Sequence, residues 1–176
     1  EWHKRGSHVS PLSSPAQAVA LMAYSSKDIY KDFNAAVRAA GRSRQEYRNN
    51  FHFKTLHFLL TKALMALRRA QNSQCRNVFR GVRDVRFAAR RGQRVRFGQF
   101  TSTSLSKEIA QKYGTDTVFQ VYTCHGADIQ AFSYYHSNRE VLIPPYETFE
   151  VTRVIRDGKR ALIWLRSTGT FRKYNC

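Results

Sequence analysis

Long apolar runs, cysteines and acidic side chains are all scarce in this chain of 176 residues. No run of about 18 apolar residues or more is present, so the sequence predicts no membrane-spanning helix. Only three cysteines occur, none in a Cys-x-x-Cys pair, and the histidines are scattered, which argues against a metal site. The start of the chain, Glu1, follows no apolar leader, so we expect a piece of a longer precursor whose N-terminal segment is missing.

Acidic residues are outnumbered by lysine and arginine, 12 against 30, which gives a formal net charge of +18 at pH 7. A field of this sign attracts phosphates and other anions. Nucleic-acid binding would also require stacking aromatic rings among the basic residues. The densest basic cluster, residues 83–96, contains only Phe87 as an aromatic residue. We therefore expect a solvated basic surface and no nucleic-acid partner, with binding through residues 83–96 as the alternative.

The few cysteines leave two interpretations open. Cys75 lies just before one strand-like segment and Cys124 ends another, so a disulfide between two strands is one possibility, and it would indicate an oxidising compartment. The other interpretation is that all three cysteines are reduced thiols in a cytosolic protein. Under the first interpretation, Cys176 is unpaired and predicts a partner outside this chain.

The spacing of apolar residues changes near residue 72. Before it, residues 16–24, 28–40 and 51–70 have helical spacing, and the first of these follows Ser14-Pro15, a helix-start signal. After it, short segments rich in β-branched and aromatic residues predict strands at 78–79, 95–100, 117–123, 129–134, 141–143, 148–155 and 161–165, with one helix at 106–113. Asp157-Gly158 predicts a hairpin turn between the last two strands.

These elements predict an α+β protein. We expect an N-terminal helical layer, residues 1–72, packed on a mainly antiparallel, β-sandwich-like core, residues 73–176. A chain of this length fits one domain, so residues 1–176 are expected to form a single, monomeric domain.

Three short segments carry side chains suited to chemistry. In residues 79–81, Phe-Arg-Gly, the planar fork of Arg80 can hold a phosphate, and the glycine lets a ligand approach the backbone. Residues 99–104 bring several hydroxyls to the end of a predicted strand, where they can orient an acidic side chain. An aromatic and polar stretch then leads to Glu140, and Pro144-Pro145 follows. Each segment alone has an ordinary structural explanation, but together they can form one site that binds anions and stabilises a cation.

In their order and spacing, these segments resemble the arginine-serine-glutamate class of mono-ADP-ribosyltransferases, vertebrate ecto-enzymes related in fold to the cholera-toxin type. The similar stretches are Val78-Phe79-Arg80-Gly81-Val82, Phe97-Gly98-Gln99-Phe100-Thr101-Ser102-Thr103-Ser104-Leu105 and Arg139-Glu140-Val141-Leu142-Ile143-Pro144-Pro145-Tyr146-Glu147-Thr148-Phe149. Residues 51–58 are also similar to the family's, so the resemblance covers nearly the whole chain.

The resemblance implies transfer of ADP-ribose from NAD or NADP to protein arginine, with NAD as a substrate and no metal. It implies catalytic roles for three residues: Glu140 offsets positive charge on the nicotinamide ribose, Arg80 holds a phosphate, and Ser102 positions Glu140. It also implies NAD contacts from Gly81, Gln99, Tyr113, Ser133 and Tyr30, although plain core packing explains the last three equally well.

The resemblance further implies an extracellular protein, secreted or held at the cell surface by a lipid anchor. In the family's cysteine pairing, Cys75 would join Cys124, and Cys176 would join a cysteine that precedes Glu1.

One position departs from the family pattern. Two residues before the catalytic glutamate, arginine-modifying members carry a second glutamate, whereas this chain has Asn138. Asparagine is neutral and cannot take a proton from an incoming guanidinium, and the neighbouring Arg139 repels a cation. We therefore predict that NAD hydrolysis survives better than transfer to arginine. The alternative is a catalytically weak NAD-binding module of the same fold.

Overall fold

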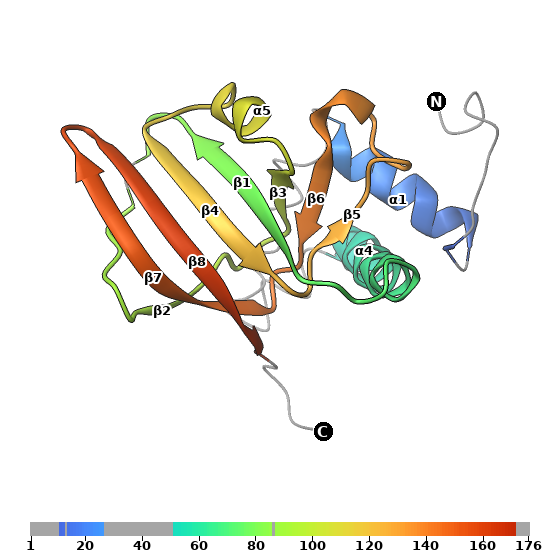
Figure 1. The fold of residues 1–176 in the computed structure, drawn as a ribbon. Coiled ribbons are helices and arrows are strands. Elements are labelled where there is room, and N and C mark those ends of the chain that lie inside the picture. The colour runs from blue at the N-terminus through green and yellow to red at the C-terminus, as the bar shows by residue number, and fades with distance from the viewer. Residues whose placement is uncertain (1–10, 13, 27–50, 86, 172–176) are drawn as a thin grey trace.

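The computed structural model describes residues 11–12, 14–26, 51–85 and 87–171. Two helices come first, α1 (Pro15–Ser25) and α4 (Phe51–Ala70), and a short helix, α5 (Lys107–Gln111), interrupts the strands. The strands are β1 (Arg76–Val82), β2 (Arg94–Arg96), β3 (Thr101–Ser104), β4 (Thr117–Thr123), β5 (Ala127–Asp128), β6 (Glu140–Ile143), β7 (Glu147–Asp157) and β8 (Arg160–Thr170). The described helices before residue 72 and strands after it follow the predicted change of pattern (Figure 1). The helix expected at residues 28–40 lies outside the described residues.

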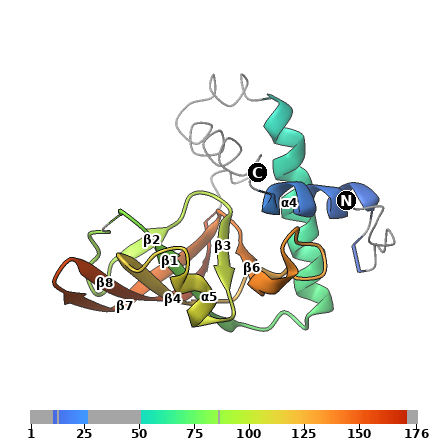
Figure 2. The same cartoon turned by 90° about the horizontal axis from the view of Figure 1, so that it is seen from above.

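The two long helices pack together through their apolar sides. Pro15 opens α1 with a φ already suited to the first turn. Along α4, Leu60, Leu64 and Leu67 recur at helical spacing and are buried with Leu21 of α1 in one cluster. Figure 2 shows α1 crossing α4 beside β6. No helix in the described part of the chain is long and apolar enough to span a membrane.

The described strands form one sheet in the order β2-β7-β8-β4-β1-β3-β6-β5. Neighbouring strands are antiparallel, except for the parallel pair β4 and β8. Val141 and Ile143 of β6 share a core cluster with Phe149 and Val151 of β7, although four strands separate β6 from β7 in the sheet. The sheet therefore folds over itself, and α1 and α4 pack at its β5–β6 end. This arrangement confirms the expected α+β class and its sandwich-like core.

One predicted strand, residues 129–134, is wrong. The backbone N–H groups of Phe132 and Ser133 both donate to the carbonyl oxygen of Ile129, at 2.9 and 2.8 Å, and close a turn there. Ile129 and Phe132 are apolar because they are buried against α1 and α4 rather than because they pair in the sheet. Burial by helices and burial in a strand thus leave the same composition in a short segment.

The predicted disulfide between Cys75 and Cys124 is present and joins the residue before β1 to the residue after β4. Beside it lies the fully buried carboxylate of Glu147, which accepts hydrogen bonds from the backbone N–H groups of Cys124 (2.9 Å) and His125 (3.1 Å). Cys176 lies outside the described residues, so the structure gives no support to a partner for it outside this chain.

Candidate active site

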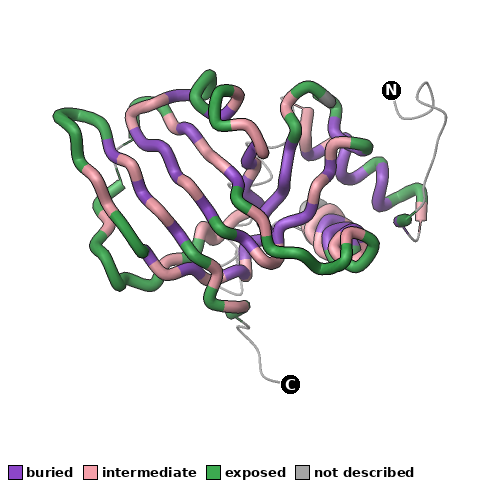
Figure 3. The backbone as a smooth tube through the Cα atoms, viewed as in Figure 1, coloured by how far each residue is buried: buried purple, intermediate pink, exposed green. Residues whose placement is uncertain are grey.

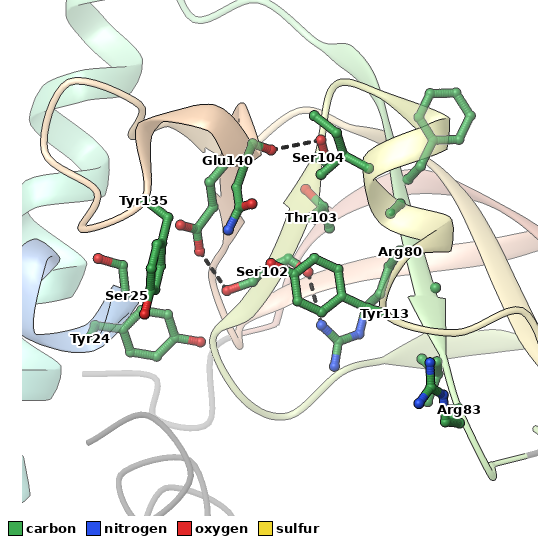
Figure 4. Close-up of a pocket in the computed structure, with 16 residues that line it drawn as sticks. Tyr24, Ser25, Arg80, Arg83, Ser102, Thr103, Ser104, Tyr113, Tyr135 and Glu140 are labelled. Carbon is green, nitrogen blue, oxygen red and sulfur yellow. Dashed lines mark hydrogen bonds between the residues drawn. The ribbon is translucent and has the colours of Figure 1, made fainter. Parts of the chain in front are cut away.

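A cavity of about 730 Å³ opens where β1, β3 and β6 meet, beside α1 and α5. The antiparallel register sets Ser104 of β3 opposite Glu140 of β6. Ser102 lies two residues along the same strand and therefore on the same face. Arg80 comes from β1, on the other side of β3. Figure 4 shows the side chains of Glu140, Ser102 and Arg80 lying across the cavity in this order.

Glu140 is a buried carboxylate, with 7% of its surface exposed. Its Oε1 accepts a hydrogen bond from the Ser102 hydroxyl at 2.7 Å, and its Oε2 accepts one from the Ser133 hydroxyl at 2.9 Å. Burial raises the pKa of Glu140 because an ion is less well solvated there, and the two hydroxyl donors partly oppose this rise in pKa. Both carboxylate oxygens are therefore held in place in the cavity wall.

The loop before Glu140 is fixed to β3 by two hydrogen bonds. The Ser104 hydroxyl donates to the carbonyl oxygen of Asn138 at 2.8 Å, and the N–H of Leu105 donates to that of Arg139 at 3.1 Å. Arg139 has a φ of +47°, a left-handed conformation that costs roughly 1 kcal/mol or more for a residue with a side chain. This bend ends the 3₁₀ turn at His136–Asn138 and starts β6 with the Glu140 side chain facing the cavity.

The opposite wall combines Arg80 with the turn after α5. Arg80 is half-buried, and its Nη1 donates to the carbonyl oxygen of Ser102 at 2.9 Å. Next to it, Gly81 packs so closely that a Cβ there would overlap the carbonyl oxygens of Ala110 and Gly114. The close packing brings the exposed ring of Tyr113 to the mouth of the cavity.

Six of the residues that the sequence singles out line this cavity: Arg80, Gly81, Ser102, Tyr113, Asn138 and Glu140. Ser133 is completely buried and contacts the carboxylate of Glu140 from behind. Gln99 and Arg139 are not among the lining residues, and Tyr30 lies outside the described residues. Within the described part of the chain, no group of three or more His, Cys, Asp or Glu side chains could hold a metal ion.

Sequence reasoning missed the wall that α1 provides. Tyr24 and Ser25, together with Tyr135, line the cavity on the side of Glu140 (Figure 4). The Tyr24 hydroxyl donates to the carbonyl oxygen of Phe100 at 2.8 Å, and the Ser25 hydroxyl accepts from the N–H of Tyr134 at 2.6 Å. These contacts join residues 76 and 109 positions apart in the sequence, so no local pattern predicts them.

Comparisons with known proteins identify the family to which the chain belongs. The family model described as NAD:arginine ADP-ribosyltransferase matches residues 1–172. NAD(P)(+)-arginine ADP-ribosyltransferase 2 from Gallus gallus is 52% identical over 179 residues, which cover 100% of this chain and 57% of that protein. GPI-linked NAD(P)(+)-arginine ADP-ribosyltransferase 1 from Mus musculus is 49% identical over 161 residues, which cover 90% of this chain and 50% of that protein. This chain therefore spans little more than half the length of these relatives.

The fold agrees with solved structures. A mutant of the eukaryotic mono-ADP-ribosyltransferase ART2.2, in complex with NAD, is similar with a TM-score of 0.76 and 38% identity, over 93% of this chain and 70% of that one. Since the family model covers nearly every residue, this protein belongs to the NAD:arginine ADP-ribosyltransferase family.

Proposed function

We propose that this protein cleaves NAD at its nicotinamide N-glycosidic bond and transfers the ADP-ribose to arginine or to water. The observation that carries the proposal is the buried Glu140 carboxylate, which Ser102 and Ser133 hold by both oxygens in the wall of a cavity that Arg80 also lines. A buried anion is costly to fold around, so its retention in a cavity favours a functional role. The NAD bound by the similar ART2.2 supports the same substrate.

Each residue has a defined role in the proposed reaction. As the bond between ribose C1′ and the nicotinamide nitrogen breaks, its electron pair leaves with nicotinamide, and positive charge develops on the ribose. Glu140 stabilises that charge from a fixed position, which contributes most when little reorganisation is needed. Arg80 pairs with the diphosphate. The oxygen of water or a guanidinium nitrogen then bonds to C1′ and loses a proton.

Asn138 is proposed to favour water over arginine as the acceptor. It lines the cavity close to Glu140 and offers a neutral amide where an incoming guanidinium would need an anion. We expect Asn138→Glu to raise the ratio of arginine adduct to free ADP-ribose about tenfold or more. The two products would be separated and counted after incubation with NAD and an arginine analogue. An unchanged ratio, or abundant adduct from the unmodified protein, would show that the acceptor is selected elsewhere.

Ser133 is proposed to position Glu140 rather than to contact NAD. It is completely buried, and its hydroxyl donates to Oε2 of the carboxylate at 2.9 Å. In Ser133→Ala, Oε2 loses a donor that stabilises the ion, so the pKa of Glu140 rises further. The reaction needs the ionised form, so the acid limb of the kcat/KM profile should move to higher pH. The other ionisable side chains that line the cavity are Arg80, Arg83, Tyr24, Tyr113 and Tyr135.

Two further variants test whether Ser133 acts by positioning Glu140 or whether any loss of a buried hydroxyl has the same effect. Ser133→Thr keeps the hydroxyl and should restore the acid limb of the profile. Thr117→Val is the control: it removes another buried hydroxyl, which does not line the cavity and donates a hydrogen bond of 2.7 Å to the carbonyl oxygen of Val85. It should leave the limb in place. If Ser133→Ala and Thr117→Val gave the same profile as the unmodified protein, Ser133 would be an ordinary core residue.

We also propose that the protein acts outside the cell. The Cys75–Cys124 disulfide suits an oxidising compartment, and the names of several relatives describe them as GPI-linked or as ecto-enzymes. A lipid anchor and a protein arginine as acceptor are proposed on the same grounds.

A further inference from the structure

We propose that the β2–β7–β8 end of the sheet binds a sulfated polysaccharide, at a surface separate from the NAD cavity. Eight exposed basic side chains make up this surface, which we call the arginine face: Arg90, Arg91, Arg94, Arg96, Arg153, Lys159, Arg160 and Arg166. Figure 3 shows that the residues at the β7–β8 turn are exposed, in contrast to the many buried residues of the central strands.

The fold assembles the arginine face from two segments that are far apart in the sequence. β2 pairs with β7, which sets Arg94 opposite Glu150. Before β2, the N–H of Gly92 donates to the carbonyl oxygen of Val151 at 2.7 Å, so the loop continues along the same edge. β8 follows β7 through a tight turn, and its Arg166 also lies opposite Glu150. The sequence cluster at residues 83–96 is therefore only half of the basic surface.

The charge on this surface is poorly compensated. Residues 90–96 and 148–166 contain these eight basic side chains, together with Arg156 on the other face of the sheet, and only two acidic ones, Glu150 and Asp157. Arg166 forms an ion pair with Glu150 at 3.0 Å, and it is the one member of the arginine face in an ion pair within the described part of the chain. Arg91 and Arg166 also line a shallow hollow beside Glu150. An anionic polymer laid along this end would therefore meet several guanidinium groups at once.

Two aromatic rings on this surface argue against single-stranded nucleic acid as the bound polymer. The guanidinium of Arg153 lies over the ring of Trp164 at 5.1 Å, and that of Arg96 lies over the ring of Phe171 at 4.8 Å. Single-stranded nucleic acid gains much of its affinity by stacking bases on open rings, and here arginines occupy these ring faces. The pairs instead hold the guanidinium forks in place for oxyanions.

A chain of sulfate groups suits this array because it presents several oxyanions at once. Seven of these eight basic residues are arginine, whose fork makes paired hydrogen bonds to oxyanions. The Cys75–Cys124 disulfide also fits an oxidising compartment, where sulfated polysaccharides occur. Because the NAD cavity is built on β1, β3 and β6, polymer bound on β2, β7 and β8 would leave it open. The proposal does not depend on the activity proposed for that cavity.

The test measures binding of the 176-residue chain to a size-defined heparin oligosaccharide by calorimetry at several salt concentrations. The triple variant Arg91→Ala, Arg94→Ala and Arg160→Ala removes three exposed charges of the arginine face. The matched control, Lys62→Ala, Arg69→Ala and Lys107→Ala, removes three exposed charges on α4 and α5. We expect the first variant to bind about 10- to 100-fold more weakly, with a smaller salt dependence, and the control to change severalfold less.

Nicotinamide release from NAD by the triple variant should equal that of the unmodified protein. Equal losses of heparin affinity in the two variants would overturn the proposal, because heparin binding would then depend only on the net charge of the protein. Single-stranded DNA of matched length and charge that binds as tightly as heparin at the same salt concentration would also overturn it, in favour of a nucleic-acid partner.

Discussion

Glu140→Gln should lower the rate of nicotinamide release from NAD by roughly 10²–10³-fold. Glutamine keeps the shape of the side chain and an oxygen that can accept from Ser102, but it carries no charge to offset the developing cation. An electrostatic group that acts mainly in the transition state affects the chemical step more than substrate binding. The rate is measured in single turnover, beside a direct titration of NAD affinity.

NAD affinity should change only a few-fold in this variant, because Arg80 and the rest of the cavity are unaltered. A variant that released nicotinamide at the rate of the unmodified protein would remove Glu140 from the proposed mechanism. A variant that lost NAD affinity and rate equally would make Glu140 a binding residue.

The same substitution should stabilise the fold, which separates loss of chemistry from unfolding. Burial raises the pKa of Glu140 in the folded state. The stability contributed by a carboxyl of this kind is present below its unfolded pKa and is lost as pH rises through its folded pKa. At neutral pH, Glu140→Gln avoids that loss, so its Tm should exceed that of the unmodified protein. The difference in Tm should shrink as the pH is lowered and the native glutamate becomes protonated.

Removal of the Cys75–Cys124 disulfide should lower the free energy of unfolding by about 4 kcal/mol, because the bond closes a loop of 49 residues. The bond also ties β1 to the end of β4, where the N–H of Cys124 donates to the buried Glu147. Reducing the bond therefore loosens a junction in which a buried carboxylate depends on ordered backbone donors.

Denaturant unfolding of Cys75→Ser with Cys124→Ser provides the measurement. Both the variant and its reference should carry Cys176→Ser, so that the reference can form only the Cys75–Cys124 disulfide and the variant can form none. The midpoint should fall while NAD affinity, measured well below that midpoint, is retained. A loss of less than about 1 kcal/mol would mean that the packing around Glu147 holds this junction without the covalent bond.

Local patterns predict much of this fold. The bounds of α4 agree with the prediction because its apolar side repeats over 20 residues. The Asp157-Gly158 pair predicts a hairpin turn, and the structure has one there: Gly158 adopts a φ of +58°, and Asp157 pairs with Arg160 across the turn. The strand predicted at residues 129–134 is wrong, because a short apolar segment buried by helices has the same composition as a strand.

The candidate site is predictable only in part, because some of its residues are brought together by strand pairing and others by tertiary contacts. Arg80, Ser102 and Glu140 are chemically distinctive and lie in β1, β3 and β6, neighbouring strands that pair, so the topology brings them together. Ser133 was singled out, but its contact with Glu140 depends on the turn that begins at Ile129. Tyr24 and Ser25 reach the cavity only because α1 packs at the β6 end, a tertiary contact with no sequence signature.

The most direct test of the proposed NAD cleavage is a mass balance on the unmodified protein, incubated with NAD and an arginine analogue. Nicotinamide, free ADP-ribose and arginine adduct are quantified from the same sample. The proposed mechanism predicts that nicotinamide appears in an amount equal to free ADP-ribose and adduct together, with free ADP-ribose in excess because the neutral Asn138 in the cavity wall offers no anion to an incoming guanidinium. NAD that binds but releases no nicotinamide above a Glu140→Ala control would contradict it and indicate a catalytically silent NAD-binding module.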